Sequence, residues 1–310
     1  MENTKTIDLK LQNYKIPIFL DSVDPILANY DHFIFDCDGV VWREKTIIPE
    51  CVEFIRSLIK INKKVYFLSN TNRLSRKDLQ NKIEKLCNLD IPLENIYNSS
   101  YLISKFIQTN HKEIKNVYLI GEEGLEKELE AHGLNIFGGP TNKNMELNEK
   151  IINNFSHEKV HDIKVDPRID ACVCGFDQYF NYFKLVYGTF VINKTGVFFG
   201  TNYDRHIRVG DRLAPGTYSF ISSLETSTGK NAVIVSKPDP QNLKIIAKDH
   251  NIESNDRILM VGDNLNTDIE FAINSGIDSI LVLTGITSED TLNKYELKNG
   301  NVPTYVIKHF

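Results

Sequence analysis

Apolar and polar residues alternate along the chain in blocks that predict strands and helices in turn. Five apolar runs end in polar or charged residues, a pattern typical of buried parallel strands. These runs are residues 33–36, 64–68, 231–236, 257–261 and 279–285. Helical patterns begin at Pro49, between the first two runs, and near Ser75, after the second. The alternation predicts the α/β class, with the five runs in one parallel sheet.

The middle of the chain carries a second alternation of its own. Residues 117–121 form an apolar run, and residues 122–132 have a helical pattern. Three further apolar runs, which we expect to be strands, are residues 169–175, 189–192 and 197–200. The polar residues 142–166 predict a solvated helix or loop. Because 310 residues exceed one ordinary core, we expect residues 102–211 to form an inserted second α/β domain.

Composition and charge narrow the class of protein. Apolar residues make up 41% of the chain and charged residues 25%, and the formal net charge is −5. These values predict a globular protein and give no sign of nucleic-acid binding. We find no targeting segment and no apolar run of membrane-spanning length, so we expect a soluble, cytoplasmic protein with no membrane partner. The five cysteines are an odd number without a CxxC spacing, which argues against structural disulfides.

Polar and charged side chains gather where the predicted strands end. They are Asp36, Asp38, Ser69, Asn70, Lys237, Asp263 and Asp268. The carboxyl ends of parallel strands meet at one edge of a sheet, so we expect these side chains to lie together. Carboxylate oxygens without nearby His or Cys select Mg²⁺ over Zn²⁺, and a Lys with a Ser hydroxyl suits a phosphate group. This edge of the sheet is therefore predicted to be a metal and phosphate site.

The same residues follow the order of the motifs of the haloacid dehalogenase (HAD) superfamily of phosphatases, which the chain resembles. The DxDG motif stands as residues 36–39, and the later motifs as Ser69, Lys237-Pro238 and residues 263–268. Further segments resemble the branch of phosphoglycolate phosphatases, pyridoxal phosphatases and 4-nitrophenylphosphatases. These segments are residues 121–125, 175–177, 200–204, 215–217, 283–285 and 302–305. The resemblance implies a Rossmann-like parallel-sheet core with an inserted α/β cap.

The resemblance also implies a role for each acidic residue. Asp36 would be the nucleophile that forms an aspartyl-phosphate, and Asp38 would protonate the leaving group and then activate water. Mg²⁺ would bind the carboxylates of Asp36 and Asp263 and the backbone carbonyl of Asp38. Asp268 would orient metal-bound water from the second shell.

The remaining site residues follow from the same resemblance. Ser69 and Asn70 would bind the phosphate group, and Lys237 would neutralise it while steadying Asp36. The segment that aligns with the family's specificity loop offers three basic residues, Arg205, His206 and Arg208. These side chains suit a small phosphate ester that carries a carboxylate, and a solvated basic turn is the alternative interpretation.

The resemblance implies a domain plan and an activity. Residues 1–101, of which the first 29 have no assigned role, and residues 212–310 would form the core, with residues 102–211 as the cap. The protein would be a Mg²⁺-dependent phosphoric monoester hydrolase and a homodimer through the cap. Its substrates would be small phosphate esters, 2-phosphoglycolate or similar metabolites and 4-nitrophenyl phosphate in vitro. A pyridoxal 5′-phosphate phosphatase is the alternative.

Two function classes other than a phosphatase need weighing. Residues 157–161 spell HExxH, the motif of zinc metallopeptidases, but their polar flanks favour a solvated face of the cap. A non-catalytic binding protein on the same fold would be expected to lack a core Asp, and none is missing here. The phosphatase hypothesis is therefore the one that the sequence supports best.

Overall fold

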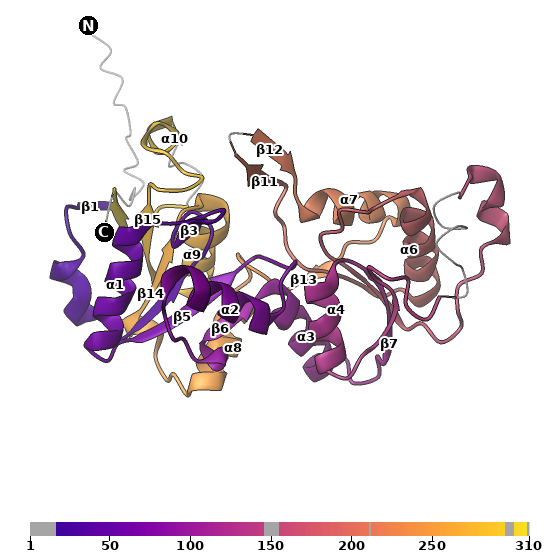
Figure 1. The fold of residues 1–310 in the computed structure, drawn as a ribbon, viewed down its shortest axis with the longest axis horizontal. Helices are drawn as coiled ribbons and strands as arrows, with labels where there is room; N and C mark the ends of the chain where they lie inside the picture. The colour runs from indigo at the N-terminus through magenta and orange to yellow at the C-terminus, as the bar shows by residue number, and fades with distance from the viewer. Residues whose placement is uncertain (1–16, 146–154, 211, 295–300, 309) are drawn as a thin grey trace, which may run out of the picture.

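A computed structural model gives the arrangement of the chain and describes residues 17–145, 155–210, 212–294, 301–308 and 310. Two bodies stand side by side, each a parallel sheet with helices on both faces (Figure 1). Both ends of the described chain lie in one body, and the middle of the chain forms the other. The α/β class with an inserted unit is therefore as predicted.

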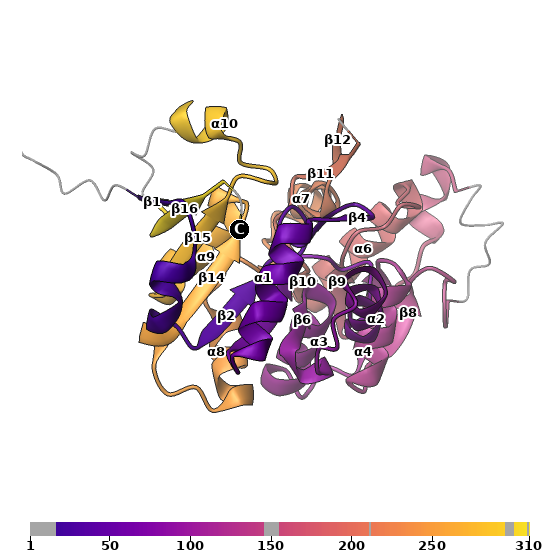
Figure 2. The ribbon, with the colours of Figure 1, turned by 60° about the vertical axis from the view of Figure 1, so that its left-hand side comes forward.

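The larger body is built on a seven-stranded parallel sheet, which we call the core sheet. Its order is β1-β16-β15-β14-β2-β5-β6. The strands are β1 (Ile18–Leu20), β2 (His32–Phe35), β5 (Lys64–Ser69), β6 (Ile96–Asn98), β14 (Ile258–Gly262), β15 (Asp278–Val282) and β16 (Tyr305–Ile307). Strand β2 lies between β14 and β5 near the middle of the sheet, and Figure 2 shows it beside β14. Its carboxyl end is therefore surrounded by neighbouring strand ends.

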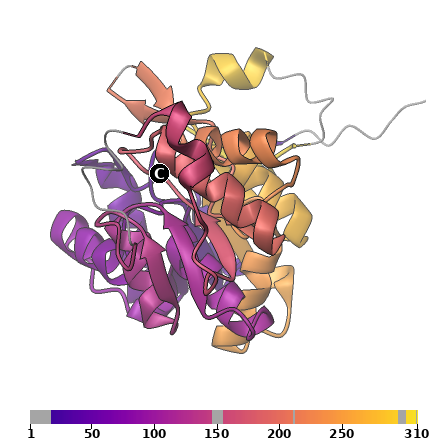
Figure 3. The ribbon, with the colours of Figure 1, turned by 90° about the vertical axis from the view of Figure 1, so that its right-hand side faces the viewer.

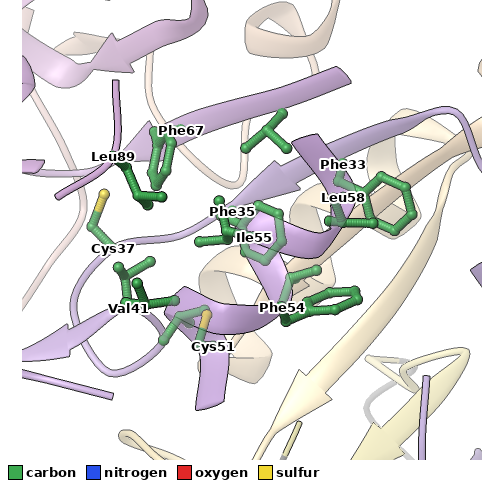
Figure 4. Packing of buried hydrophobic residues seen from close by; sticks show 14 of the residues in the cluster. Phe33, Phe35, Cys37, Val41, Cys51, Phe54, Ile55, Leu58, Phe67 and Leu89 are labelled. Carbon is green, nitrogen blue, oxygen red and sulfur yellow. The ribbon is translucent and has the colours of Figure 1, made fainter. Parts of the chain in front are cut away.

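Helices cover both faces of the core sheet. They are α1 (Pro49–Lys60), α2 (Arg76–Cys87), α3 (Ser99–Asn110), α8 (Gln241–His250), α9 (Glu270–Ser275) and α10 (Glu289–Lys294). Alternate strand residues face opposite sides. Phe33 and Phe35 of β2 pack against α1, where Figure 4 shows them beside Ile55 and Leu58. On the other face, Ile34 packs with residues of α3, α8 and α9.

The second body contains a five-stranded parallel sheet, which we call the cap sheet, in the order β13-β10-β9-β7-β8. Its strands are β7 (Asn116–Ile120), β8 (Asn135–Gly138), β9 (Ala171–Cys174), β10 (Phe198–Gly200) and β13 (Val233–Ile234). Its helices are α4 (Glu123–Ala131), α6 (Tyr182–Thr195) and α7 (Thr217–Thr228). Helix α4 packs on one face together with α3, and α6 and α7 pack on the other (Figure 3). Helix α3 thus contributes to the cores of both bodies.

Short elements complete the described chain. Two hairpins, β3 (Trp42–Arg43) with β4 (Thr46–Ile47) and β11 (His206–Val209) with β12 (Arg212–Pro215), are antiparallel. The 3₁₀ helices are η1 (Asp24–Asn29), η2 (Leu93–Asn95), η3 (His157–Asp162) and η4 (Asn255–Arg257), and η5 (Leu265–Ile269) is a π-helix. Hairpin β11–β12 belongs to the second body, but its Gly210 N–H donates to Glu44 Oε1 of the first at 2.5 Å. The hairpin therefore links the two bodies.

One predicted strand lies in the other sheet, and one is not a strand. Residues 231–236 were expected in the core sheet, but β13 pairs with β10 and so extends the cap sheet. Residues 189–192 were expected to be a strand and lie inside helix α6. That helix is apolar on several sides because it is buried between the cap sheet and α7, and a short apolar run does not distinguish a buried helix from a strand.

Other features agree with the sequence or extend it. Within residues 142–166 the described part contains the exposed 3₁₀ helix η3, and residues 146–154 lie outside the described residues. All five cysteines are free and buried. In the part of the chain that the structure describes, every helix is too short or too polar to cross a membrane.

Candidate active site

Lys237 lies at the centre of a buried charge cluster where β2 and β14 end. Its Nζ donates to Asp36 Oδ1 at 2.5 Å and to Asp268 Oδ1 at 2.7 Å. Asp36 follows β2 directly, and its backbone N–H bonds to Val261 of β14. Lys237 and Asp268 are each 1% exposed and Asp36 is 8% exposed. Residues that are 201 positions apart in sequence therefore meet at one strand edge, as predicted.

Asp263 is fixed through both its side chain and its own backbone N–H. Its Oδ2 accepts the N–H of Ile286 at 2.6 Å, and its own N–H donates to Asp268 Oδ2 at 3.0 Å. Two glycines make room for the carboxylate: a Cβ at Gly285 would lie 1.7 Å from Asp263 Oδ2, and one at Gly39 would lie 2.2 Å from it. This close approach explains why glycine stands at both positions.

The electrostatics of the cluster favour an additional cation. Burial raises the pKa of Asp36 to about 8 even though Lys237 opposes the shift, and burial also raises the pKa of Asp263. Burial alone would lower the pKa of Lys237, but the carboxylates of Asp268 and Asp36 more than offset it, so that pKa is raised. One ammonium group thus faces three buried carboxylates. An excess of buried negative charge is costly unless a cation compensates it.

The donor set fits a hard divalent metal ion. Oxygen atoms of Asp36, Asp263 and Asp268 all lie within 4.8 Å of one another. Hard oxygen donors without sulfur or imidazole suit Mg²⁺, Mn²⁺ or Ca²⁺. Both oxygens of Asp268 already accept hydrogen bonds, Oδ1 from Lys237 and Oδ2 from the N–H groups of Asp263 and Asn264. Asp268 is therefore better placed to orient its neighbours than to hold the ion alone.

Asp38 stands apart from the buried cluster and is exposed. Its Oδ1 accepts a hydrogen bond from the indole Nε1 of Trp42 at 2.8 Å. Trp42 is fully buried and is the only tryptophan of the chain. Sequence analysis missed this partner. Its position four residues after Asp38, across a glycine turn, was the available signal.

The loop after β5 carries the predicted phosphate-binding residues. Ser69 is 3% exposed, and its Oγ accepts the N–H of Thr71 at 3.2 Å. Asn70 does not point to a free site: its Nδ2 donates to Asp204 Oδ1 at 3.1 Å and to the carbonyl of Lys237 at 3.4 Å. Burial raises the pKa of Asp204 to about 6, although the Asn70 hydrogen bond opposes this. Asp204 was not predicted as a site residue, and it comes from the second body.

The predicted specificity residues lie on hairpin β11–β12 or directly before it: His206 and Arg208 belong to β11, and Arg205 precedes it. Arg205 and His206 are exposed, and the side chain of Arg208 lies outside the described residues. Among the described residues, no hydrogen bond joins these side chains to the cluster of Lys237, Asp36 and Asp268. The hairpin itself contacts the core through Glu44, which follows Trp42 and Arg43.

The HExxH segment does not form a metal site in the described chain. Residues 157–161 lie on the exposed 3₁₀ helix η3 rather than on a buried helix, and His157 Nδ1 is 3.0 Å from the hydroxyl of Tyr182. Among the described residues, the group of acidic, His or Cys side chains that could hold a metal is Asp36, Asp263 and Asp268. The metallopeptidase hypothesis therefore has no support in the geometry.

Comparison with known families agrees with this site. A model of haloacid dehalogenase-like hydrolases matches residues 33–135, and a HAD-hydrolase-like model matches residues 234–310. The two matches include Asp36 at one end and Lys237 and Asp263 at the other. The chain belongs to the haloacid dehalogenase-like hydrolases.

Relatives and solved structures narrow the class further. The chain is 36% identical to phosphoglycolate phosphatase 1A of Arabidopsis thaliana, over 90% of this chain and 75% of that protein. It is 31% identical to the 4-nitrophenylphosphatase of Schizosaccharomyces pombe, over 91% and 92%. The p-nitrophenyl phosphatase of Archaeoglobus fulgidus superposes with a TM-score of 0.76 at 26% identity, over 91% and 97%. The predicted HAD fold and phosphoric monoester hydrolase class are confirmed.

Proposed function

We propose that the protein hydrolyses small phosphate monoesters through a phosphorylated Asp36, with Mg²⁺ as the metal ion. The observation that carries the proposal is the contact of Lys237 with Asp36 and Asp268, next to Asp263. A Lys held between two carboxylates is a fixed positive charge beside a nucleophile. This arrangement suits phosphoryl transfer, in which charge stabilisation and positioning supply most of the rate enhancement.

In the proposed reaction, the carboxylate of Asp36 attacks phosphorus and the ester oxygen leaves. Lys237 offsets negative charge on the transferring group, and the hydroxyl of Ser69 donates a hydrogen bond to it. Mg²⁺, when bound to Asp36 and Asp263 and to the backbone carbonyl of Asp38, would screen the charges of carboxylate and phosphate from one another. Asp36 then leaves again when water attacks the aspartyl-phosphate.

Asp38 would move the protons in both steps. It gives its proton to the leaving oxygen and then takes one from the attacking water. Exposure and the hydrogen bond from Trp42 support this role, because a proton-transfer group must reach substrate yet keep one orientation. A buried Asp that is locked by Lys237 could not do so.

For the substrate, we propose 2-phosphoglycolate or a similarly small metabolite, with 4-nitrophenyl phosphate as a substrate in vitro. The names of the relatives support this choice, and the exposed Arg205 and His206 offer N–H donors for a substrate carboxylate. We further propose that the cap sheet and its helices form the substrate-reading cap, that this cap extends from residue 102 through β13 rather than ending at residue 211, and that it mediates a homodimer. A cytoplasmic location also stays a prediction.

The test is phosphate release with and without Mg²⁺ from a panel containing 2-phosphoglycolate, 4-nitrophenyl phosphate and pyridoxal 5′-phosphate. Asp36→Asn keeps the size of the side chain and removes the nucleophile, and Asp90→Asn, at an exposed position, is the matched control. We expect Mg²⁺-dependent release by wild type and Asp90→Asn and none by Asp36→Asn. Equal activity of the two variants would show that Asp36 is not the nucleophile.

A further inference from the structure

Residues 70–73, which we call the Asn70–Arg73 loop, join the phosphate-binding Ser69 to the cap. The loop belongs to the core chain, yet most of its side-chain contacts are made with cap residues. Two of its side chains, Asn70 and Asn72, bond to cap segments that are far apart in sequence.

Asn72 is 2% exposed and uses both ends of its amide. Its Nδ2 donates to Thr217 Oγ1 at 3.0 Å, at the start of α7, and its Oδ1 accepts the N–H of Phe176 at 2.7 Å, just after β9. Its own carbonyl accepts a hydrogen bond from Ser100 Oγ at 3.0 Å. One core residue is therefore fixed to two separate parts of the cap.

Two glycines allow the cap to come this close. A Cβ at Gly124 would lie 2.4 Å from the carbonyl oxygen of Arg73, and one at Gly175 would lie 3.0 Å from Asn72 Oδ1. Both glycines stand in segments that sequence analysis singled out without giving them a task. Their lack of a side chain lets the Asn70–Arg73 loop lie directly against the cap.

Asn70 and Arg73 extend the same contact. Asn202 Nδ2 of the cap donates to the Asn70 carbonyl at 2.5 Å, in addition to the contact of Asn70 with Asp204. Arg73 donates to Glu122 Oε2 at 3.0 Å and stacks over the ring of Phe176 at 5.0 Å. Three of the four residues of the loop thus contact the cap, and Asn72 is the most buried of them.

We propose that Asn72 is a positioning residue that sets how closely the cap lies against the Asn70–Arg73 loop. It thereby determines the affinity for substrates whose leaving group reaches the cap. The inference rests on the proposed role of Ser69 and the core site. Without Asn72, the phosphate group still finds Ser69, Lys237 and the metal-binding carboxylates. What changes is the distance between that group and the cap surface near Phe176.

The experiment compares Asn72→Ala with the pair Thr217→Val and Thr217→Ser. Valine keeps the shape of Thr217 but removes the acceptor of the Asn72 amide, whereas serine keeps it. Two quantities are measured for each variant: KM for 4-nitrophenyl phosphate, whose ring reaches beyond the phosphate site, and the inhibition constant of inorganic phosphate, which has no leaving group. Thermal unfolding checks that each variant is folded.

We expect Asn72→Ala to raise KM for 4-nitrophenyl phosphate about tenfold. The N–H of Phe176 loses its acceptor, which costs about 1.4 kcal/mol, and this free energy corresponds to a factor of ten. Thr217→Val should raise it about threefold, since only one hydrogen bond is lost. Thr217→Ser should keep the wild-type KM, because serine still offers the hydroxyl acceptor. The phosphate inhibition constant should stay within about twofold in all three variants, since binding energy is lost only at the cap.

Other results overturn the inference. If KM and the phosphate inhibition constant rise together, Asn72 only keeps the loop folded. If neither changes in folded Asn72→Ala, the residue positions nothing. A wild type whose activity is absent or survives Asp36→Asn refutes the proposed function as well, whereas an active, Asp36-dependent wild type with an unchanged KM in Asn72→Ala refutes the positioning role alone.

Discussion

Gly285→Ala should weaken Mg²⁺ binding although it replaces none of the residues that we propose bind the metal. The Cβ of an alanine at this position would lie 1.7 Å from Asp263 Oδ2, 2.4 Å from its Cγ and 2.7 Å from its Cβ. The backbone around residue 285 is joined to the same carboxylate by the Ile286 N–H. The carboxylate must therefore move away from the methyl group.

The structure sets the size of this effect. To reach ordinary contact at 3.4 Å, the carboxylate must retreat by about 1.7 Å, which breaks the 2.6 Å hydrogen bond from Ile286. A hydrogen bond to a charged group contributes about 1.5–3 kcal/mol. Loss of such an outer contact typically weakens metal affinity about 10–100-fold, and we expect a change in this range for Mg²⁺.

The assay is a Mg²⁺ titration with two readouts, the rate of phosphate release and the Mg²⁺-dependent rise in melting temperature. Gly276→Ala is the control: it changes a glycine with a φ of +66° in the same body, and an added Cβ there has no neighbour within 4 Å. This control imposes backbone strain that Gly285→Ala does not, because Gly285 has no positive φ, and it lacks the contact with Asp263. We expect the midpoint of the titration to move in Gly285→Ala and to stay in place in Gly276→Ala.

Gly285→Ala would refute this reasoning if both readouts gave the wild-type midpoint. The same midpoint with a lower maximal rate would also contradict it, since the displaced carboxylate is expected to act on metal binding first. A similar shift in both variants would show that the contact with Asp263 is not its cause.

Three further predictions concern other parts of the molecule. Lys184→Met leaves Asp177 buried without its 2.5 Å partner and should lower the free energy of unfolding by about 3–5 kcal/mol in urea titrations; a Lys184→Met, Asp177→Leu double variant should recover most of the loss, and no recovery would contradict the explanation. Burial raises the pKa of Asp204 to about 6 from 3.8, so the folded protein holds this proton more tightly than the unfolded chain does. As pH rises from about 4 to 6, the free energy of unfolding of metal-free wild type should therefore fall by about 2–3 kcal/mol relative to that of Asp204→Asn. Parallel curves of unfolding free energy against pH would contradict this prediction. Trp42→Phe removes the hydrogen-bond donor to Asp38 and should lower kcat for alkyl phosphates about tenfold. The loss should be much smaller for 4-nitrophenyl phosphate, because its leaving group needs little protonation. Equal losses of kcat for the two kinds of substrate would argue against proton transfer by Asp38.

The carboxylates of the core site could be predicted because they stand at strand ends. Asp36 and Asp263 are separated widely in sequence, but parallel strands bring their carboxyl ends to one edge regardless of the length of chain between them. Lys237 reaches the same edge from the segment that follows β13 of the cap sheet, so its position was predicted correctly from a sheet assignment that was wrong. Polar residues after apolar runs are visible in sequence, so this part of the geometry needed no knowledge of side-chain packing.

Sheet membership and contacts between the two bodies could not be predicted in the same way. Strand β13 is two residues long and joins the cap sheet because β10 offers it an edge, which is a long-range pairing that local periodicity does not encode. Strands β1, β6 and β16 each have three residues, too few for a period-two pattern. Asn72 looks like any polar loop residue until its partners Phe176 and Thr217 are in place.

The most direct test of the account is identification of the phosphorylated residue. Wild type and Asp36→Asn would be mixed with 4-nitrophenyl phosphate and Mg²⁺, quenched in acid within the first turnover, digested and analysed by mass spectrometry. The account predicts one phosphoryl group on the peptide that contains Asp36, absent from the variant and lost in alkali. Steady phosphate release by wild type with no such adduct, or an adduct on another residue, would contradict it.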